Sequence, residues 1–365
     1  MISSQKTGLK LSQEQYDIIG WDDTWVAGID LLNDETVQSL DNTDLHVTPD
    51  MEYQSISPFI QGDFEVTERL RLSAGVRHED ISINVDDTTT LYGYGSNDVI
   101  GGTNDYSETV FNIGSIYQFT EKVSGFVSFN QGFGLPDYGR VLRGTWGDDP
   151  SVNTPIDFNS MSEAKPVVTD NYEMGFNFRG DKLTLGATTY ISIAEDGANL
   201  VLNGDNYEVE RQKTEIWGYE LTSTYQLFDS TMLHVLYSHI EGEVDTNGDN
   251  SVDSKMDLRN TSPDRLMLAA NHSFSETIKG RIQYNHLFDE SKEENDVGSA
   301  QSFDGYGLFD LSTQFDFKEK GRIALGIENV FDEQYINYFS QVRQSDAYYF
   351  SGRGRTMSVN YEVDF

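Results

Sequence analysis

The stretch TMSVNYEVDF, residues 356–365, decides the fold. Apolar side chains stand at every second position from Met357 to Phe365, and polar side chains fill the positions between them. Successive side chains of a β-strand point to opposite faces, so one face of this strand is apolar and the other is polar. Such a strand suits a wall that has hydrocarbon on one side and water on the other.

The same alternation recurs upstream, for example over residues 309–317 and 70–76. Most of these segments run for about ten to fourteen residues, whereas strands of globular proteins average about five or six. The pattern predicts fourteen long strands, near 24–33, 53–66, 68–83, 107–118, 121–131, 168–180, 182–195, 214–228, 230–244, 263–275, 277–290, 305–317, 319–331 and 353–365.

The predicted connections alternate between tight turns and long polar loops. The long loops are expected near 34–52, 84–106, 132–167, 196–213, 245–262, 291–304 and 332–352. Short turns on one rim and long loops on the other are typical of an antiparallel transmembrane β-barrel, and every tight turn falls on the side of the C-terminus. A large soluble sandwich, a propeller or a β-helix is the alternative, although no fixed repeat of a blade or coil is found.

Composition narrows the function classes. The chain has 25 Lys and Arg against 61 Asp and Glu, a formal net charge of −36, so nucleic acid is not an expected partner. There is no cysteine, which removes thiol catalysis and Cys-type zinc sites. No apolar run of about 18 residues could form a membrane helix. Residues 1–9 lack the apolar core of a secretory signal, so an exported protein would need a preceding segment.

Several motifs, taken in order, carry a family resemblance. Residues 327–335 read IENVFDEQY, residues 352–356 read GRGRT, and the final strand ends in Phe365. Upstream matches are LSAGVRHE at 72–79, FNQGFGLP at 129–136 and DNYEMGF at 170–176. Over residues 60–365 the chain therefore resembles TonB-dependent outer-membrane receptors.

The resemblance implies an all-β fold, the C-terminal part, about 14 strands, of a 22-stranded transmembrane antiparallel barrel. Residues 1–23 are then expected to be the remnant of a preceding strand and loop, residues 24–365 a partial barrel, and the plug domain absent. The implied location is the Gram-negative outer membrane. The implied partners are a ferric siderophore, TonB through the missing plug segment, outer-membrane lipid and lipopolysaccharide, and the barrel assembly machinery through Phe365.

The implied function is import of a ferric siderophore, with no resident cofactor. Within the family, a receptor for haem, cobalamin, nickel chelates or an oligosaccharide is an alternative. A haem receptor is disfavoured because Gly134-Leu135-Pro136 stands where such receptors usually read Arg-Ala-Pro. A passive porin or structural barrel is a second alternative, and a soluble β-rich binding protein is a third.

Ligand-binding residues are expected where arginines and aromatic side chains gather in the outer loops. Arg pairs with carboxylate or catecholate oxygens in a fork geometry, and rings cover its flat faces. The alternative is that the rings form an interfacial girdle and the arginines pair with nearby Asp. The candidates are Tyr138, Arg140, Arg143 and Trp146 in one loop, with Tyr338, Arg343, Tyr348 and Tyr349 in a later loop.

No catalytic constellation is found, and the six His residues show no metal-binding spacing, so an enzyme is not expected. Residues 245–253 read DTNGDNSVD, in which Asp245, Asn247, Asp249 and Asp253 follow the ligand order of a calcium loop. Asn250 replaces the turn glycine and Met256 stands where the bidentate Glu belongs, so a solvated acidic loop is the favoured interpretation. Arg69, Arg71 and Arg77 are expected on the inner face of the wall, as structural charges.

Overall fold

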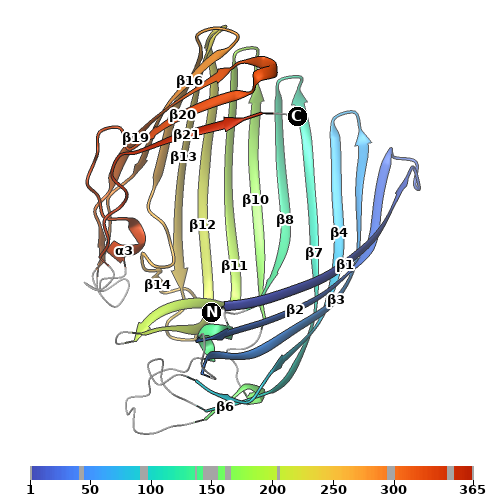
Figure 1. Ribbon diagram of the computed structural model, residues 1–365. Coiled ribbons are helices and arrows are strands. Elements are labelled where there is room, and N and C mark those ends of the chain that lie inside the picture. Colours follow the sequence, from blue (N-terminus) through green and yellow to red (C-terminus); the bar gives the residue numbers. More distant parts are fainter. Residues whose placement is uncertain are drawn as a thin grey trace.

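The computed structural model describes residues 2–40, 45–90, 98–135, 138–142, 155–160, 166–203, 206–293, 301–342 and 349–363. These residues form a 16-stranded antiparallel sheet, and Figure 1 shows its long strands side by side in a curved wall. The strands along the wall are β1 (Ile2–Tyr16), β2 (Asp23–Ser39), β3 (His46–Thr67), β4 (Leu70–Val85), β7 (Gly102–Thr120), β8 (Val123–Gly134), β10 (Val167–Arg179), β11 (Leu183–Asn203), β12 (Asn206–Phe228), β13 (Thr231–Val244), β15 (Arg265–Ser273), β16 (Ile278–Leu287), β19 (Tyr306–Asp316), β20 (Arg322–Glu328) and β21 (Thr356–Glu362).

Short elements decorate the rim that carries the long connections, lowermost in Figure 1. They are β14 (Ser254–Lys255), which pairs with β13, the pair β17 (Glu290–Lys292) and β18 (Gln301–Phe303), the trio β5 (Thr88–Thr89), β6 (Asp98–Ile100) and β9 (Ile156–Asp157), the helices α1 (Tyr138–Val141) and α3 (Tyr338–Val342), and the 3-10 turn η2 (Phe158–Ser160). A second 3-10 turn, η3 (Lys318–Lys320), lies on the opposite, tight-turn rim. We call the two rims the loop rim and the turn rim. Within the described residues, no helix is long and apolar enough to cross a membrane.

The predicted all-β antiparallel class is confirmed, and each of the fourteen predicted segments overlaps a strand of the wall. The alternation of side chains also holds. On β7, Phe111 and Ile113 are 51% and 58% exposed on the outer face, while Asn112 between them lies on the inner face against Gly75. Exposed Leu, Ile, Phe and Met on every second residue give the outer face the apolar character that lipid requires.

Two predicted loops are mostly strand. β2 and β3 continue to within a few residues of each other, and β11 and β12 pair as far as Asn203 with Asn206, so the expected loops 34–52 and 196–213 were wrong. Beyond the apolar band both faces of a strand meet water, and period-two alternation disappears there while the backbone ladder continues. Residues 2–16, outside the fourteen predicted strands but within the expected strand and loop remnant at 1–23, pair with β2 along their whole length.

The 327–335 motif forms a staple after β20. Asn329 has a φ of 51° and is 3% exposed. Its amide nitrogen donates to the carbonyl oxygens of Glu333 and Arg353, at 2.9 and 3.2 Å, and its amide oxygen accepts the Glu333 N–H at 2.8 Å. Asp332 accepts the backbone N–H of Arg355 at 2.8 Å. The motif therefore ties the end of β20 to the segment that enters β21.

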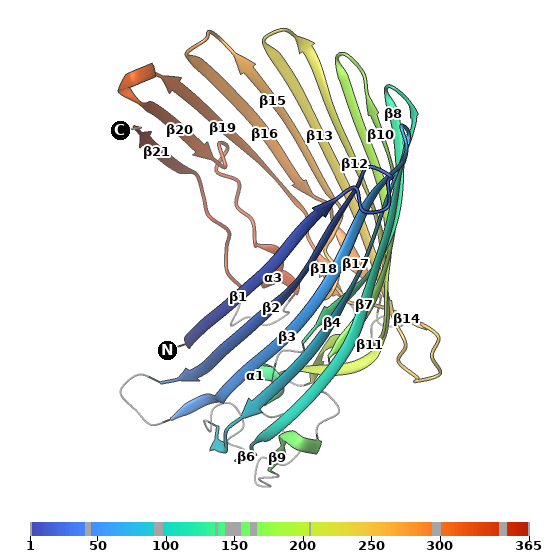
Figure 2. The ribbon, with the colours of Figure 1, turned by 90° about the vertical axis from the view of Figure 1, so that its right-hand side faces the viewer.

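Figure 2 shows the curvature of the wall, with β1 and β21 as its two margins. No pairing joins β1 to β21 within the described part of the chain. The wall curves into an open trough, and its inner face is the concave side (Figure 2). The loop-rim elements lie at one end of this concave side, where a ligand from outside would first meet the protein (Figure 2).

Candidate functional site

One group of loop-rim residues packs against the inner face of β4, and we call it the α1 cluster. Tyr138 and Leu142 come from the α1 segment and Phe158 from η2, and Leu142 and Phe158 are fully buried. The rings of Tyr138 and Phe158 meet edge to face at 6.0 Å. The remaining buried members are Ile81, Ile83, Val85 and Val99. The long loop between β8 and β10 is thus anchored at two points on the wall.

Tyr138, a predicted ligand residue, lies inside this cluster and is 9% exposed. Burial raises the pKa of Tyr138 above its ordinary range, so the phenol is neutral at any physiological pH. From the β11–β12 hairpin, Arg211 donates to the carbonyl oxygen of Pro166 at 3.1 Å. Because Tyr138 is buried in the α1 cluster, it holds the loop between β8 and β10 on the wall. A contact between its ring and a ligand stays a prediction.

A second group, the α3 cluster, lies farther along the wall, toward β21. It joins the loops between β13 and β15, between β16 and β19, and between β20 and β21. Leu258, Phe303 and Val342 are buried together, and Tyr338 packs its ring edge-on against Phe303 at 5.1 Å. The Tyr338 hydroxyl donates to the carbonyl oxygen of Leu258 and lies 2.5 Å from that of Thr261. Burial, with the negative charges of Glu290 and Asp257, raises the pKa of Tyr338.

A buried polar network completes the α3 cluster. Asp257 pairs with Arg259 at 2.6 Å and accepts the side-chain amide of Gln301 at 3.2 Å. The oxygen of that same amide accepts the Leu258 N–H at 2.9 Å. A buried charge is tolerated when it is paired and hydrogen-bonded, so this network fixes the loops relative to each other. Tyr338 is accordingly a structural tie between loops as well as a predicted ligand residue.

The other predicted ligand residues fall into two sets. Tyr349 and its neighbour Phe350 are 54% and 61% exposed, and Phe339, in α3 beside Tyr338, is 64% exposed. These exposed rings belong to the loop between β20 and β21. The backbone of Arg140 belongs to α1, but its side chain lies outside the described residues, as do Arg143, Trp146, Arg343 and Tyr348 entirely.

The acidic loop after β13 is held by its own hydrogen bonds. Asp245 is 5% exposed and accepts the N–H groups of Asn247, Gly248 and Asn250 at 2.7 to 3.1 Å. Asp253 accepts the N–H and hydroxyl of Thr246 at 3.0 and 2.9 Å, and these bonds lower its pKa. Asp249 accepts the N–H of Ser251 at 3.0 Å. No group of three or more His, Asp or Glu in the described part of the chain is arranged to hold a metal ion. The solvated acidic loop stays the favoured prediction, with calcium binding as its alternative.

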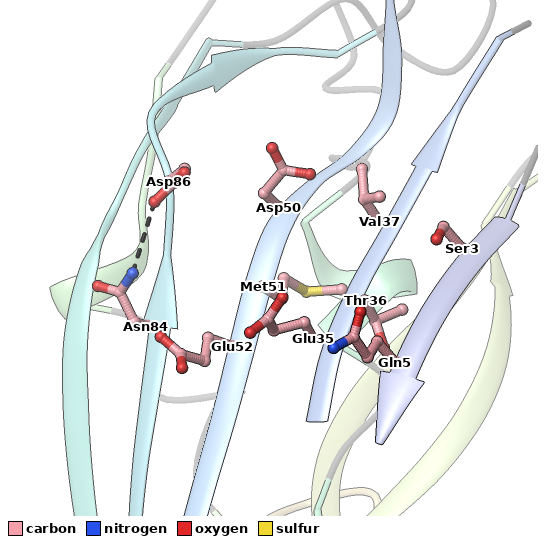
Figure 3. A pocket seen from close by; sticks show the side chains of 10 residues that line it. All are labelled: Ser3, Gln5, Glu35, Thr36, Val37, Asp50, Met51, Glu52, Asn84 and Asp86. Carbon is pink, nitrogen blue, oxygen red and sulfur yellow. Dashed lines mark hydrogen bonds between the residues drawn. The ribbon is translucent and has the colours of Figure 1, made fainter. Parts of the chain in front are cut away.

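A groove of about 350 Å³ crosses the outer face of the first strands near the loop rim. Figure 3 shows its lining side chains, which come from β1 to β4 and the residue after β4. Four carboxylates, Glu35, Asp50, Glu52 and Asp86, line this groove, and none of its lining residues is Lys or Arg. The groove therefore repels an anionic chelate and is not a candidate for the ligand site.

The inner wall below the loops carries paired charges. Arg77 contacts Asp30 at 2.6 Å and also pairs with Glu79, which accepts the Ser57 hydroxyl at 2.5 Å. The Arg77 guanidinium lies 5.7 Å from the centre of the Phe59 ring. This position agrees with the expectation that Arg77 faces inward as a structural charge.

Sequence reasoning missed the residues that anchor the loops, chiefly Phe158 and Leu258. Each has one apolar neighbour two residues before it, Ile156 or Met256, in an otherwise polar stretch, and that short pair was the available signal. Two apolar residues are too few to show a periodicity, so their partners on a distant strand could not be assigned.

Comparison with known proteins finds a matching protein family. The model for the TonB-dependent receptor-like β-barrel matches residues 3–330. Among curated proteins, the ferric aerobactin receptor of Klebsiella pneumoniae is 27% identical over 98% of this chain, and that of Escherichia coli is 26% identical over 98%. The rhizobactin receptor of Rhizobium meliloti is 24% identical over 86% of the chain. The chain spans about half the length of these relatives, 52%, 52% and 43% respectively.

Solved structures give the same fold. The copper transporter OprC aligns with a TM-score of 0.75 at 16% identity, over 98% of this chain and 56% of that one. The ferric-catecholate import receptor Fiu of Escherichia coli K12 aligns with a TM-score of 0.67 at 15% identity, over 98% of this chain and 54% of that one. At these identities the likeness describes the shape of the wall.

Proposed function

The chain belongs to the TonB-dependent receptor-like β-barrel family, and from that premise we propose that it serves the import of a ferric siderophore. The family and the fold place the protein in the Gram-negative outer membrane. The observation that carries the proposal is the match to two ferric aerobactin receptors along 98% of the chain. Their name suggests the ligand class, a ferric siderophore of the aerobactin kind.

The outer loops supply the proposed binding surface. The α1 and α3 clusters hold two sides of the loop rim in place before a ligand arrives, which lowers the ordering cost of binding. Arg140, Arg143 and Arg343 would contact the oxygens of an anionic iron chelate, and Trp146, Tyr348 and Tyr349 would cover its apolar parts. Tyr138 and Tyr338 would act mainly by holding these neighbours in position.

The proposed mechanism is capture followed by gated passage. The loops bind the chelate, and TonB acts on a plug domain of the kind that the resemblance implies, so that a path opens beside the inner wall. The energy comes from the inner membrane, and the barrel catalyses no covalent step. Outer-membrane lipid and lipopolysaccharide, and the barrel assembly machinery through Phe365, are proposed as further partners, and nucleic acid is not.

Growth on single iron sources tests the proposal. Cells that depend on this protein for ferric aerobactin should lose uptake when Arg140 and Arg143 are both changed to Ala. Lys122→Ala is the matched control, because Lys122 pairs with Asp181 at 2.9 Å on the turn rim, away from the loops. Unchanged uptake in the double variant would remove both arginines from the site. Failure of the unmodified protein to support growth on any ferric siderophore would contradict the proposal itself.

Planar-bilayer conductance separates a receptor from a passive porin. A receptor with its plug in place should stay closed in the absence of TonB, whereas a porin conducts constitutively. Constitutive conductance of the complete protein would favour the porin.

A further inference from the structure

Three basic residues on the inner face of β15 and β16 have no acidic partner. They are Arg265, Arg281 and Lys279, and we call them the cation ladder. None of the three takes part in an ion pair within the part of the chain that the structure describes. The chain has 25 Lys and Arg against 61 Asp and Glu, so acidic partners are plentiful. Their lack on two neighbouring strands leaves a local excess of positive charge.

The strand alternation sets the face on which the ladder lies. Leu268 and Ile282 are exposed on the outer face. Arg265 lies three residues from Leu268, an odd number, so it is on the inner face. Arg281 and Lys279 lie one and three residues from Ile282, so they are on the inner face too.

The register sets the heights of the three charges. Arg281 pairs with Asn271, and Lys279 pairs with Ser273. Asn271 lies six residues along β15 from Arg265, which is about 20 Å toward the turn rim at about 3.4 Å a residue. Lys279 lies about 7 Å farther in the same direction. The ladder therefore runs from the loop rim to near the turn rim, along two strands that lie side by side (Figure 2).

The upper end of the ladder lies below the α3 cluster. Arg265 pairs with Leu287, and Leu287 pairs with Tyr306. Both Leu287 and Tyr306 pack against the α3 cluster. Asp264, next to Arg265 in sequence, contacts His239 at 2.6 Å instead. The charge of Arg265 is therefore open to the trough beside the proposed binding surface.

Arg281 is held in a fixed position. Its guanidinium donates to the side-chain oxygen of Gln283 at 2.6 and 3.1 Å and to that of Asn271 at 3.1 Å. Amide oxygens orient the guanidinium without cancelling its charge, and these bonds use three of its five N–H groups. Asp310, on β19 opposite Gln283, accepts the Asn329 N–H at 2.9 Å. The guanidinium is thus positioned in advance for an anion in the trough.

The inner face near the other margin is different. Asp30 lies 2.6 Å from Arg77 and 3.8 Å from Lys10, and Arg71 pairs with Glu65. Paired charges of opposite sign leave little field at a distance. The unpaired charge is therefore confined to one side of the trough.

We propose that the cation ladder guides an anionic iron chelate along β15 and β16, from the α3 cluster to the turn rim. The inference rests on the proposed function, because it gives the charge of the same cargo and its route. Guanidinium groups bind carboxylate or catecholate oxygens, and fixed positive charges raise the local concentration of an anion. Separate stations bind the cargo in turn, each weakly enough to release it to the next.

Uptake of radioactive ferric aerobactin by cells that carry the complete protein tests the ladder. Import is measured in energised cells, and surface binding in cells deprived of the proton-motive force. R281Q/K279Q removes the two lower charges, which lie about 20 Å or more below Arg265. We expect import to slow about tenfold, the lower end of the effect of fixed charges on a charged ligand, and surface binding to stay unchanged.

Two matched variants accompany this one. R281K/K279R keeps both charges and should import at nearly the rate of the unmodified protein. R71Q is the control, because it removes an inner-face cation that Glu65 already neutralises. Rates are expressed per molecule of protein in the outer membrane, so that poor assembly is not counted as slow import.

Four results would overturn the proposal. They are unchanged import in R281Q/K279Q, an equal loss in R71Q, an equal loss in R281K/K279R, and constitutive leakage of bulky solutes through R281Q/K279Q. The last would mean that the ladder pairs with acidic groups of a domain inside the barrel rather than with the cargo.

Bromide soaked into crystals of the complete protein detects the same charges without any transport. Anomalous peaks are expected beside Arg281 and Lys279, and none beside Arg71. Empty positions at Arg281 and Lys279 would overturn the ladder even if import were slowed. Bromide bound there in a protein that imports no ferric siderophore would contradict the proposed function alone.

Discussion

Removal of one hydroxyl group, Tyr338→Phe, should loosen the α3 cluster without disturbing its apolar packing. The hydroxyl serves the carbonyl oxygens of Leu258 and Thr261, while the ring packs on Phe303. Phenylalanine keeps the ring contact and leaves the two carbonyls without this donor. A buried polar group left without its partner costs about 1–3 kcal/mol. Because Thr261 is only 3% exposed, water does not readily replace the lost donor, and we expect about 2 kcal/mol.

Amide hydrogen exchange measured by mass spectrometry is the suitable assay, because it reports the opening of residues 254–262 separately from unfolding of the wall. A cost of about 2 kcal/mol corresponds to roughly thirtyfold faster exchange there, and exchange in β13 should not change. Tyr335→Phe is the matched control. The Tyr335 ring packs on Tyr306 at 4.3 Å, and its hydroxyl has no hydrogen bond within the described residues. Equal rates in Tyr338→Phe and the unmodified protein, or equal acceleration in Tyr335→Phe, would refute the role of the hydroxyl.

Three further outcomes follow from the same structure. Phe158→Ala should destabilise the α1 cluster by about 3–5 kcal/mol, seen as faster exchange at 81–85, whereas Phe339→Ala, which removes a 64% exposed ring, should leave that exchange unchanged. Asn329→Ala should lower the denaturant midpoint of the barrel by the equivalent of about 2–3 kcal/mol, and a midpoint equal to that of the unmodified protein would dismiss the staple. Because hydrogen bonds from Thr246 lower the pKa of Asp253, its contribution is present above the ordinary Asp pKa and is lost as pH falls through the lowered value. Asp253→Asn should therefore speed exchange of the Thr246 amide at neutral pH and make no difference in strong acid, relative to an unstructured peptide.

The wall could be predicted from the sequence because lipid imposes a strict rule on it. Where one face meets hydrocarbon, every second residue must be apolar, and segments such as 107–118 and 357–365 record that rule directly. The rule fails outside the lipid band. The 196–213 stretch was predicted as a loop, and residues 2–16, rich in polar residues, were assigned only through the family resemblance, as the remnant of a strand and loop. Both stretches contribute long strand segments, because the backbone ladder continues where both faces of a strand meet water.

The candidate site was harder to predict, because composition does not distinguish a ring that binds a ligand from a ring that anchors a loop. Tyr138 and Tyr338 have the residue type expected of a binding surface, but both contribute to packing within the outer loops. The difference depends on partners far away in sequence, such as Ile81 for one and Leu258 for the other. The C-terminal motif, conversely, was recognised only by resemblance, and the structure supplies its physical role through Asn329.

The α1 and α3 clusters share no member, and several strands separate the parts of the wall on which they rest. Changes confined to one of them should add to changes in the other within about 0.5 kcal/mol, as expected for sites without common partners. Under selection by phages or antibodies, the loops around one cluster could therefore accept substitutions in small steps while the loops around the other cluster keep their structure. Recognition of a new ligand could then evolve in separate steps, first in the loops around one cluster and later in those around the other.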